Sequence, residues 1–222
     1  MKRPALVLRP EPGGSATADR LRAAGLLAIR LPLFRVAPIA WSPPADQYDA
    51  LLLTSANAVR QAGSALSALR ALPVVAVGRG TAAAARTAGF TVAAVGRSDG
   101  AQALALARQN GWHRILRLAG RERTRLEGVT DIPVYASNPL PPPPNALRVA
   151  QGAVALLHSS RAATHFRHLL ERDVVDPKTV RIAAISSAVV DAAGTGWNRI
   201  VIAKEPNDAA LVAATCTLAI DQ

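Results

Sequence analysis

Hydrogen-bond donors follow several apolar segments of the sequence, where they could hold an anion. Ser55 and the amide of Ala56 come after one apolar run, and Gly78 and Thr81 come after the next. The first N–H groups of a helix have no partner within it, so a helix start with a nearby hydroxyl binds negatively charged groups. Each position also has an ordinary structural interpretation, because Ser and Thr commonly cap helices.

Arginines form a second group of candidates. Arg121, Arg123 and Arg125 follow a later apolar run, and Gly120 allows a sharp turn before them. Arg121 lies nearest the end of the run and is the better candidate for a ligand contact, and Arg9 has a similar place after the first run. The alternative interpretation of the three later arginines is the solvated face of a helix.

Other kinds of chemistry find little support in the sequence. Residues 78–81 match neither the phosphate-loop spacing nor the dinucleotide-binding spacing of glycines, which argues against nucleotide binding. His165 and His168 are three residues apart, but no Cys or paired carboxylate stands nearby to complete a metal site. No Ser-His-Asp order or nucleophile elbow is present either. We therefore expect no metal and no cofactor.

The composition is that of a folded, basic protein. Half of the 222 residues are apolar and only 4% are aromatic, so the chain can bury an aliphatic core. The net charge of +11 favours anionic partners such as polycarboxylates, phosphates or nucleic acid, with a pure solubility effect as the alternative. Nucleic acid is not expected, because the chain lacks a Lys/Arg-dense tail and interleaved aromatics. The single Cys216 and the absence of a membrane-length apolar stretch predict a reduced, cytoplasmic protein without membrane contact.

The elements that must position these residues alternate between strand and helix. Short apolar runs bounded by Gly, Pro, Asp and Asn alternate with Ala-rich segments of helical period, which predicts parallel sheets with helices on both faces. We expect strands at 5–8, 50–53, 74–77, 91–95, 114–118, 153–157, 180–185 and 199–202, and helices at 15–24, 56–69, 81–88, 101–109, 161–171, 187–193 and 208–218.

A faint internal repeat divides the chain further. Residues 50–59 resemble residues 154–163, each an apolar run that enters a Ser-bearing turn and then a helix. The segments 31–38 and 132–139 resemble each other too, and both are Pro-bounded and poor helix formers, which is typical of connecting strands. If the first carries the chain out of one lobe and the second carries it back, lobe one comprises 1–36 and 138–222, and lobe two is the inserted segment 37–137. A stiff proline spacer follows at 141–144.

Several dispersed segments carry a recognisable pattern: Val7–Pro10, Leu52–Val59, Val75–Ala82, Leu118–Arg121, Val134–Tyr135, the run that ends in Ser159, and Ala203–Leu211. No single segment is specific, but their order and spacing together are. In this order they resemble the uroporphyrinogen-III synthase family over nearly the whole chain. The resemblance implies two similar α/β lobes with parallel sheets, joined by a two-stranded β ladder, with the active site in a cleft between them.

The resemblance also implies site residues. Tyr135 matches the cleft tyrosine of the family and is the candidate catalytic residue, as the general acid for a departing hydroxyl. Ser159 is a further candidate for substrate binding. The sequence departs from the family at residues 185–190, where a threonine is expected, and Ser186 or Ser187 could supply the missing donor. Ring packing with a solvated hydroxyl is the ordinary interpretation of Tyr135.

The activity implied by the resemblance is the closure of hydroxymethylbilane, a linear tetrapyrrole rich in carboxylates, to uroporphyrinogen III with inversion of the terminal ring and loss of water. The preceding deaminase is the candidate source of this substrate. A monomer is the default expectation, because no amphipathic zipper is evident. The alternatives are a non-catalytic two-lobed protein that binds a small anion and an inactive homologue of the family.

Overall fold

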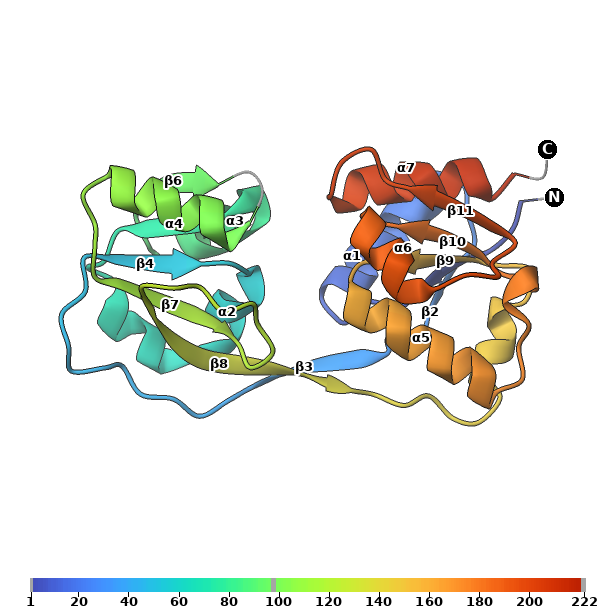
Figure 1. Cartoon of the computed structure of the whole chain (residues 1–222), viewed down its shortest axis with the longest axis horizontal. Coiled ribbons are helices and arrows are strands. Elements are labelled where there is room, and N and C mark those ends of the chain that lie inside the picture. Colours follow the sequence, from blue (N-terminus) through green and yellow to red (C-terminus); the bar gives the residue numbers. More distant parts are fainter. Residues whose placement is uncertain (1, 97–98, 221–222) are drawn as a thin grey trace. The chain divides into compact units, whose positions relative to one another are not determined.

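The computed structural model describes residues 2–96 and 99–220, and the chain divides into two compact units. Unit 1 contains the chain up to Arg35 together with the chain from Pro139 onward, and unit 2 is Val36–Asn138. The chain leaves unit 1 within β3 (Phe34–Pro38) and returns within β8 (Val129–Pro139), which are neighbours in one sheet (Figure 1).

Unit 1 is built on a parallel sheet with the strand order β11-β10-β9-β1-β2. Its three central strands are buried along their whole length, because both faces of the sheet are covered there. Leu6 and Leu8 face a core with α5 (Ser160–Arg172), whereas Ala5 and Val7 face a core with α7 (Asp208–Leu218). The strands are β1 (Ala5–Val7), β2 (Ala28–Arg30), β9 (Val154–Leu157), β10 (Arg181–Ala184) and β11 (Arg199–Ile202).

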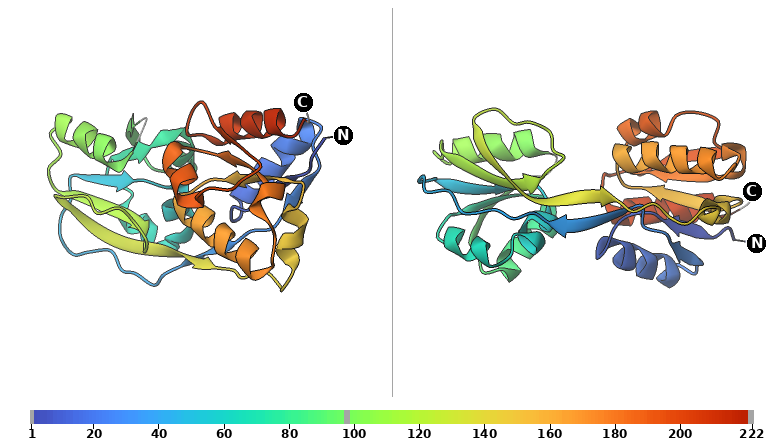
Figure 2. Two further views of the ribbon diagram at one scale, coloured as in Figure 1. Left: turned by 45° about the vertical axis from the view of Figure 1, so that its right-hand side comes forward. Right: turned by 90° about the horizontal axis from the view of Figure 1, so that it is seen from below.

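The helices of unit 1 are sorted onto the two faces. Helices α1 (Gly13–Ala23) and α7 cover one face, and α5 and α6 (Ser187–Ala193) cover the other, as the two opposite cores and Figure 2 show. Phe166 of α5 is fully buried and stacks on Trp197 with ring centroids 5.9 Å apart. Two short 3₁₀ turns complete the unit, Ala146–Ala150 and Pro177–Thr179.

Unit 2 carries a sheet with the order β3-β8-β7-β4-β5-β6. Helices α2 (Ala56–Gln61) and α3 (Gly78–Thr87) contribute to the core on one face, and α4 (Gly100–Gln109) contributes to the core on the other. The remaining strands are β4 (Ala50–Leu53), β5 (Val74–Val77), β6 (Val92–Gly96) and β7 (Ile115–Gly120). Leu51 and Leu53 face the first core and Ala50 and Leu52 the second, so this sheet too is buried on both faces.

The predicted α/β class with parallel sheets is confirmed, and three local features differ from the expectation. The helix expected at 56–69 is two elements, α2 and a 3₁₀ turn (Ser64–Leu69), because Gly63 between them has φ +67°, a conformation that ends a helix. Arg121–Arg125 lie in a loop and not on a helix face. The strand β2 was not expected, since its three residues are too few to show a period.

The order of equivalent strands is the same in the two sheets. The repeated segment contributes β4 to unit 2 and β9 to unit 1. In unit 2, β5 and β6 follow β4 toward one edge of the sheet, and in unit 1, β10 and β11 follow β9 in the same way. On the other side of the repeated strand lies β7 in unit 2 and β1 in unit 1. The helix that follows the outermost strand is α4 in unit 2 and α7 in unit 1. The echo between residues 50–59 and 154–163 therefore reflects equivalent positions in the two sheets.

Among residues 2–96 and 99–220, no helix is both long and apolar enough to cross a lipid bilayer.

Candidate functional site

The order of strands in unit 2 creates a place where a ligand can bind. The chain continues from β4 to β5 on one side, and later returns to β7 on the other side of β4. The connections that leave β4 and β7 therefore diverge at the carboxyl edge of the sheet. In open parallel sheets, ligands bind in the crevice at such a switch point.

A cavity of about 390 Å³ lies at this switch point. It brings together two predicted site residues, Ser55 from the end of β4 and Tyr135 from β8. The start of α4 also lines the cavity, so the N-terminal end of a helix stands beside it. The lining residues are Thr54, Ser55, Asp99, Gly100, Ala101, Arg117, Gly120, Glu122, Arg123, Thr124, Leu126 and Tyr135.

Tyr135 owes its position to Gly120 on the neighbouring strand. The two residues are register partners of β7 and β8, and the amide of Arg121 donates to the carbonyl of Tyr135 at 2.8 Å. A Cβ at Gly120 would lie 2.9 Å from Cζ of the tyrosine ring and 3.1 Å from its hydroxyl oxygen. The ring therefore lies directly against the glycine, and the glycine leaves the space that the ring needs.

Gly120→Ala is expected to lower kcat by roughly tenfold, because the new methyl group displaces the ring of Tyr135 and small misplacements of reacting groups are costly. Gly80→Ala is the matched control, since nothing lies within 4 Å of a Cβ at that position. Steady-state kinetics of both variants provide the measurement. Equal activities of the two variants would show that the ring position is unimportant.

Ser55 caps helix α2, as its ordinary interpretation required. Its Oγ accepts a hydrogen bond from the amide of Asn57 at 3.2 Å, and its backbone is extended. The residue also lines the cavity, so the hydroxyl has a second surface from which it can meet a ligand. Asp99 caps α4 in the same way, accepting from the amide of Gln102 at 2.9 Å.

Ser55→Ala should lower the free energy of unfolding by about 1 kcal/mol, the usual effect of losing a helix cap, and should raise KM a few-fold. Ser55→Thr keeps the hydroxyl and should restore both. Urea unfolding and steady-state kinetics separate the two effects. A stability loss with an unchanged KM would mean that Ser55 is a helix cap and nothing more.

The other predicted residues of unit 2 do not line this cavity. Ala56 is the first residue of α2, and Gly78 is the first residue of α3 with φ +76°. Thr81 lies inside α3 and is only 7% exposed, so its hydroxyl faces protein more than solvent. Gly78 and Thr81 follow β5, the neighbour of β4, and thus stand at the same edge of the sheet as Ser55.

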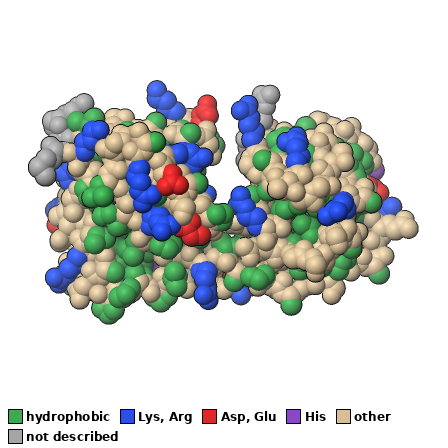
Figure 3. Space-filling view, turned by 180° about the vertical axis from the view of Figure 1, so that it is seen from behind, with side chains coloured by type: hydrophobic (Ala, Val, Ile, Leu, Met, Phe, Trp, Pro, Cys, Tyr) green, Lys and Arg blue, Asp and Glu red, His purple; other side chains and the backbone are tan. Residues whose placement is uncertain are grey.

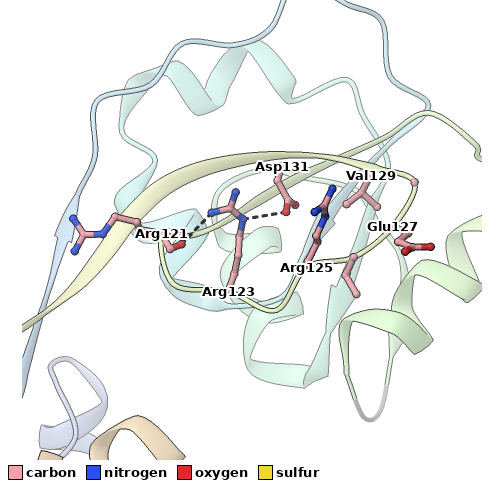
Figure 4. A pocket seen from close by; sticks show the side chains of 8 residues that line it. Arg121, Arg123, Arg125, Glu127, Val129 and Asp131 are labelled. Carbon is pink, nitrogen blue, oxygen red and sulfur yellow. Dashed lines mark hydrogen bonds and ion pairs between the residues drawn. The ribbon is translucent and has the colours of Figure 1, made fainter.

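Arg121 lies on a second hollow of unit 2, formed by the loop between β7 and β8. Its guanidinium binds Glu122 at 2.9 Å and the side chain of Asn138 at 3.0 Å, and 55% of its side chain is exposed. In Figure 4 it points away from Arg123 and Arg125. The hollow has a volume of about 630 Å³ and is lined by Arg121, Arg123, Arg125, Leu126, Glu127, Gly128, Val129 and Asp131.

The loop is held by an ion cluster around Asp131. The buried Arg117 of β7 forms a fork on this carboxylate, with Nε and Nη2 at 2.5 and 2.6 Å from its two oxygens. Arg123 adds a contact of 3.0 Å, which Figure 4 also shows. Burial disfavours the charged carboxylate of Asp131, but the two arginines outweigh this effect and lower its pKa. The fork also orders Thr124, whose carbonyl accepts from Arg117 at 2.9 Å.

Unit 1 has its switch point between β1 and β9, and an ion cluster stands there. The Nη1 atom of Arg9 lies 2.9 Å from Oδ1 of Asp208, the first residue of α7. His158, which directly follows β9, places Nε2 at 2.8 Å from the same oxygen. From α1, Thr17 donates to it at 2.6 Å, and Arg20 contacts Oδ2 at 2.5 Å.

The protonation states within this cluster follow from burial and charge. Burial lowers the pKa of His158 and the charge of Arg9 adds to this, while the hydrogen bond to Asp208 opposes it, so the imidazole is neutral at pH 7. Burial disfavours a charged Asp208, but the hydrogen bonds from His158 and Thr17 and the charge of Arg9 hold its pKa well below the usual range. The carboxylate is therefore ionised and His158 donates to it from Nε2.

The predicted serines of unit 1 stand at the starts of two helices. Ser159 caps α5, its Oγ accepting from the amide of Ala162 at 3.2 Å. Ser186 has the N-cap position of α6, but its side chain makes no capping hydrogen bond. Ser187 is the first residue of α6 and is exposed. Both helices lie on the face of the sheet opposite to α1 and α7.

Reasoning from the sequence missed His158, Asp208, Asp99 and Arg117 as members of these sites. A signal for His158 was present, because the repeat aligns it with Thr54 at the end of an equivalent strand. Asp208 could not be found in this way, since its partners lie up to 199 positions away in the chain.

The charges of the surface are mainly basic. Figure 3 shows Lys and Arg side chains on the visible face of both units, with fewer acidic groups among them. Within the described ranges, no group of three or more His, Cys, Asp or Glu side chains is placed to hold a metal ion. His165 and His168 instead line a hollow of about 350 Å³ with Phe34, Pro139, Arg161 and Thr164.

Comparison with known proteins adds independent information. The family model of uroporphyrinogen-III synthase HemD matches residues 15–213. The chain is similar to the crystal structure of uroporphyrinogen-III synthetase from Helicobacter pylori, with 18% identity, coverage of 98% of this chain and 100% of that chain, and a TM-score of 0.67. A mutant uroporphyrinogen III synthase from the extremely thermophilic bacterium Thermus thermophilus is 17% identical, with coverage of 96% and 97% and a TM-score of 0.56. These structures support the fold. A search of curated proteins found no match.

Proposed function

The chain belongs to the uroporphyrinogen-III synthase family, and on that premise we propose which of its residues carry out the family's reaction. The family match over residues 15–213 is the observation that carries the functional conclusion. Its members are cyclising lyases of haem biosynthesis. The function of the chain is the closure of hydroxymethylbilane to uroporphyrinogen III, with inversion of the terminal ring and loss of water.

The substrate supplies most of the reactivity in this reaction. The electron-rich pyrrole expels the hydroxyl of the hydroxymethyl group, which leaves as water when it gains a proton, and an azafulvene cation remains. The terminal ring attacks this cation through its own substituted α-carbon and forms a spiro intermediate. The older bond from that carbon to the neighbouring methylene then breaks, and the methylene cation so released bonds to the free α-carbon of the terminal ring. Loss of a proton from this carbon restores the aromatic pyrrole, now inverted. The task of the protein is to hold the linear tetrapyrrole in a folded conformation that favours this attack over closure without inversion.

We assign the proton transfer to Tyr135. Its ring is held against Gly120, and it lines the cavity at the switch point of unit 2 beside Ser55. A phenol hydroxyl there can donate to the departing oxygen, and general acids of this kind typically contribute about 10²–10⁴-fold to the rate. The cavity of about 390 Å³ is large enough for part of the substrate near the reacting group.

We assign the substrate carboxylates to donors at the strand ends of each unit. Hydrogen bonds to charged groups contribute about 1.5–3 kcal/mol each, so several moderate contacts can bind a polycarboxylate without one dominant residue. The net charge of +11 speeds the capture of such an anion. The proposed contacts are Ser55, Ala56, Gly78, Thr81 and Arg121 in unit 2, and Arg9, Ser159, Ser186 and Ser187 in unit 1.

Product analysis tests the function directly. Purified protein is supplied with hydroxymethylbilane, and the products are oxidised to porphyrins and separated by chromatography. The type III isomer is expected in excess over the type I isomer that forms without enzyme. Type I alone would identify the chain as a binder of small anions or as an inactive homologue.

Three further properties belong to this proposal. We infer a monomer in the cytoplasm that receives its unstable substrate from the preceding deaminase. Sedimentation at micromolar concentration, alone and mixed with the deaminase, tests the oligomeric state and the handover together. A defined dimer of the chain would contradict the first inference.

A further inference from the structure

The guanidinium of Arg9 is held on one side only. Its Nη1 atom binds Asp208 at 2.9 Å and lies 3.3 Å from Oγ1 of Thr17. Among the described residues, Nε and Nη2 have no hydrogen-bond partner, and 31% of the side chain is exposed. These two atoms form the edge with which arginine binds a carboxylate through two parallel hydrogen bonds.

The backbone of unit 1 is shaped around this side chain. A Cβ at Gly13 would come within 2.5 to 2.6 Å of Nε, Cζ and Nη2 of Arg9. Gly13 is the first residue of α1, where glycine has no advantage for the helix itself, so its small size serves the guanidinium. The observed position of the guanidinium beside α1 therefore depends on the absence of a side chain at Gly13.

The cluster occupies the place that the cavity occupies in unit 2. His158 follows β9 as Thr54 follows β4, and Asp208 begins α7, the counterpart of α4. In unit 2 the equivalent switch point is open and lined by Ser55 and Tyr135. In unit 1 the side chains of His158, Asp208 and Thr17 stand at this point, beside the guanidinium of Arg9.

His158 has a specific part in this arrangement. Its side chain is only 11% exposed, so the imidazole has little contact with water. Its contact with the cluster is made by Nε2, which binds Oδ1 of Asp208. The same oxygen binds Arg9. The charged groups that face the imidazole are Arg9, Arg20 and Asp208. The hydrogen bond from His158 holds the carboxylate of Asp208 in place, and this carboxylate in turn holds the guanidinium of Arg9.

We propose that His158 and Asp208 are positioning residues that hold Arg9 by Nη1, so that its Nε–Nη2 edge receives one carboxylate of the substrate in unit 1. The identity of the ligand rests on the proposed function, whereas the positioning of Arg9 does not. Arg9 touches the substrate, and His158 and Asp208 act through it.

Kinetics of a double-mutant cycle test the proposal. Arg9→Lys removes the paired donors, and His158→Leu removes the positioning contact. Each variant is expected to raise KM about tenfold with little change in kcat. A tenfold change corresponds to about 1.4 kcal/mol. The double variant should be no worse than either single variant, because both lose the same interaction. His158→Gln keeps an N–H donor and should return KM to within about twofold of the wild type.

Two more variants separate positioning from simple stability. Gly13→Ala favours the helix but pushes Arg9 aside, so KM should rise about tenfold while the melting temperature stays or increases. His168→Leu on the exposed side of α5 is the control for loss of a histidine and should leave KM unchanged. Additive effects of Arg9→Lys and His158→Leu, or a normal KM in Gly13→Ala, would overturn the proposal.

A readout without turnover distinguishes this proposal from the proposed function. In protein labelled with ¹⁵N, the Nε–Hε resonance of Arg9 is assigned with Arg9→Lys and followed during titration with uroporphyrin, which carries the carboxylates of the product. The resonance should shift in the wild type and in His158→Gln, and shift far less in His158→Leu. A chain that makes the type III isomer but shows no shift at Arg9 refutes the proposal alone. A chain without synthase activity that shows the shift refutes only the function.

Discussion

Replacing Tyr135 by phenylalanine is expected to lower kcat about 100-fold, the lower end of the range for a lost general acid, while KM changes little. The variant keeps the ring against Gly120 and loses only the hydroxyl, so packing and the cavity are preserved. Departure of the hydroxyl group from the substrate then depends on water. Single-turnover kinetics with hydroxymethylbilane, followed by isomer analysis, provide the measurement.

Tyr48 offers a matched control for this experiment. It is the other tyrosine of the chain, packs against the same core of unit 2, and lines a hollow with Asp46 and His113 and not the cavity of Tyr135. Tyr48→Phe should therefore have wild-type kinetics. If Tyr135→Phe also turned over at the wild-type rate, the hydroxyl would have no part in proton transfer, and the ring would serve packing alone.

Replacing Asp208 by asparagine is expected to give the largest loss of stability, about 3 kcal/mol at pH 7, as is typical when one partner of a largely buried ion cluster is removed. The side chain of Asp208 is 17% exposed and accepts from Arg9, which follows β1, from His158, which follows β9, and from Thr17 of α1. Without its charge, Arg9 and Arg20 repel each other at the start of α7. Urea unfolding of the wild type and the variant measures the difference.

The pH dependence of this difference has a definite sign. The folded-state pKa of Asp208 lies well below its unfolded value of about 3.9, so the unfolded chain binds the proton more readily. The stabilisation is therefore complete above that pH and is lost progressively as the pH falls from that value through the folded-state pKa. Asp191→Asn, at an exposed position of α6, should be neutral throughout. A pH-independent gap between the wild type and Asp208→Asn would contradict the charged role.

Local structure was largely determined by the sequence itself. Runs such as 50–53 and 74–77 are strands with the expected bounds, because a strand covered on both faces is apolar at nearly every position. The helices 187–193 and 208–218 also begin and end as expected. The prediction failed where one residue changed the backbone, as at Gly63, where positive φ divides a segment whose apolar period continues.

The composition of the sites was decided by tertiary structure. The sequence pattern places Ser55 after a strand and Tyr135 on a connecting strand, but only the order β8-β7-β4 brings them to one cavity. Arg9 was a candidate from its place after a strand, yet its orientation depends on Asp208, 199 positions later. Strand and helix formation depend on residues a few positions apart in the sequence, and can therefore be predicted from it. The contacts of a side chain at a sheet edge depend on which strands become neighbours, which is fixed only when the whole core packs.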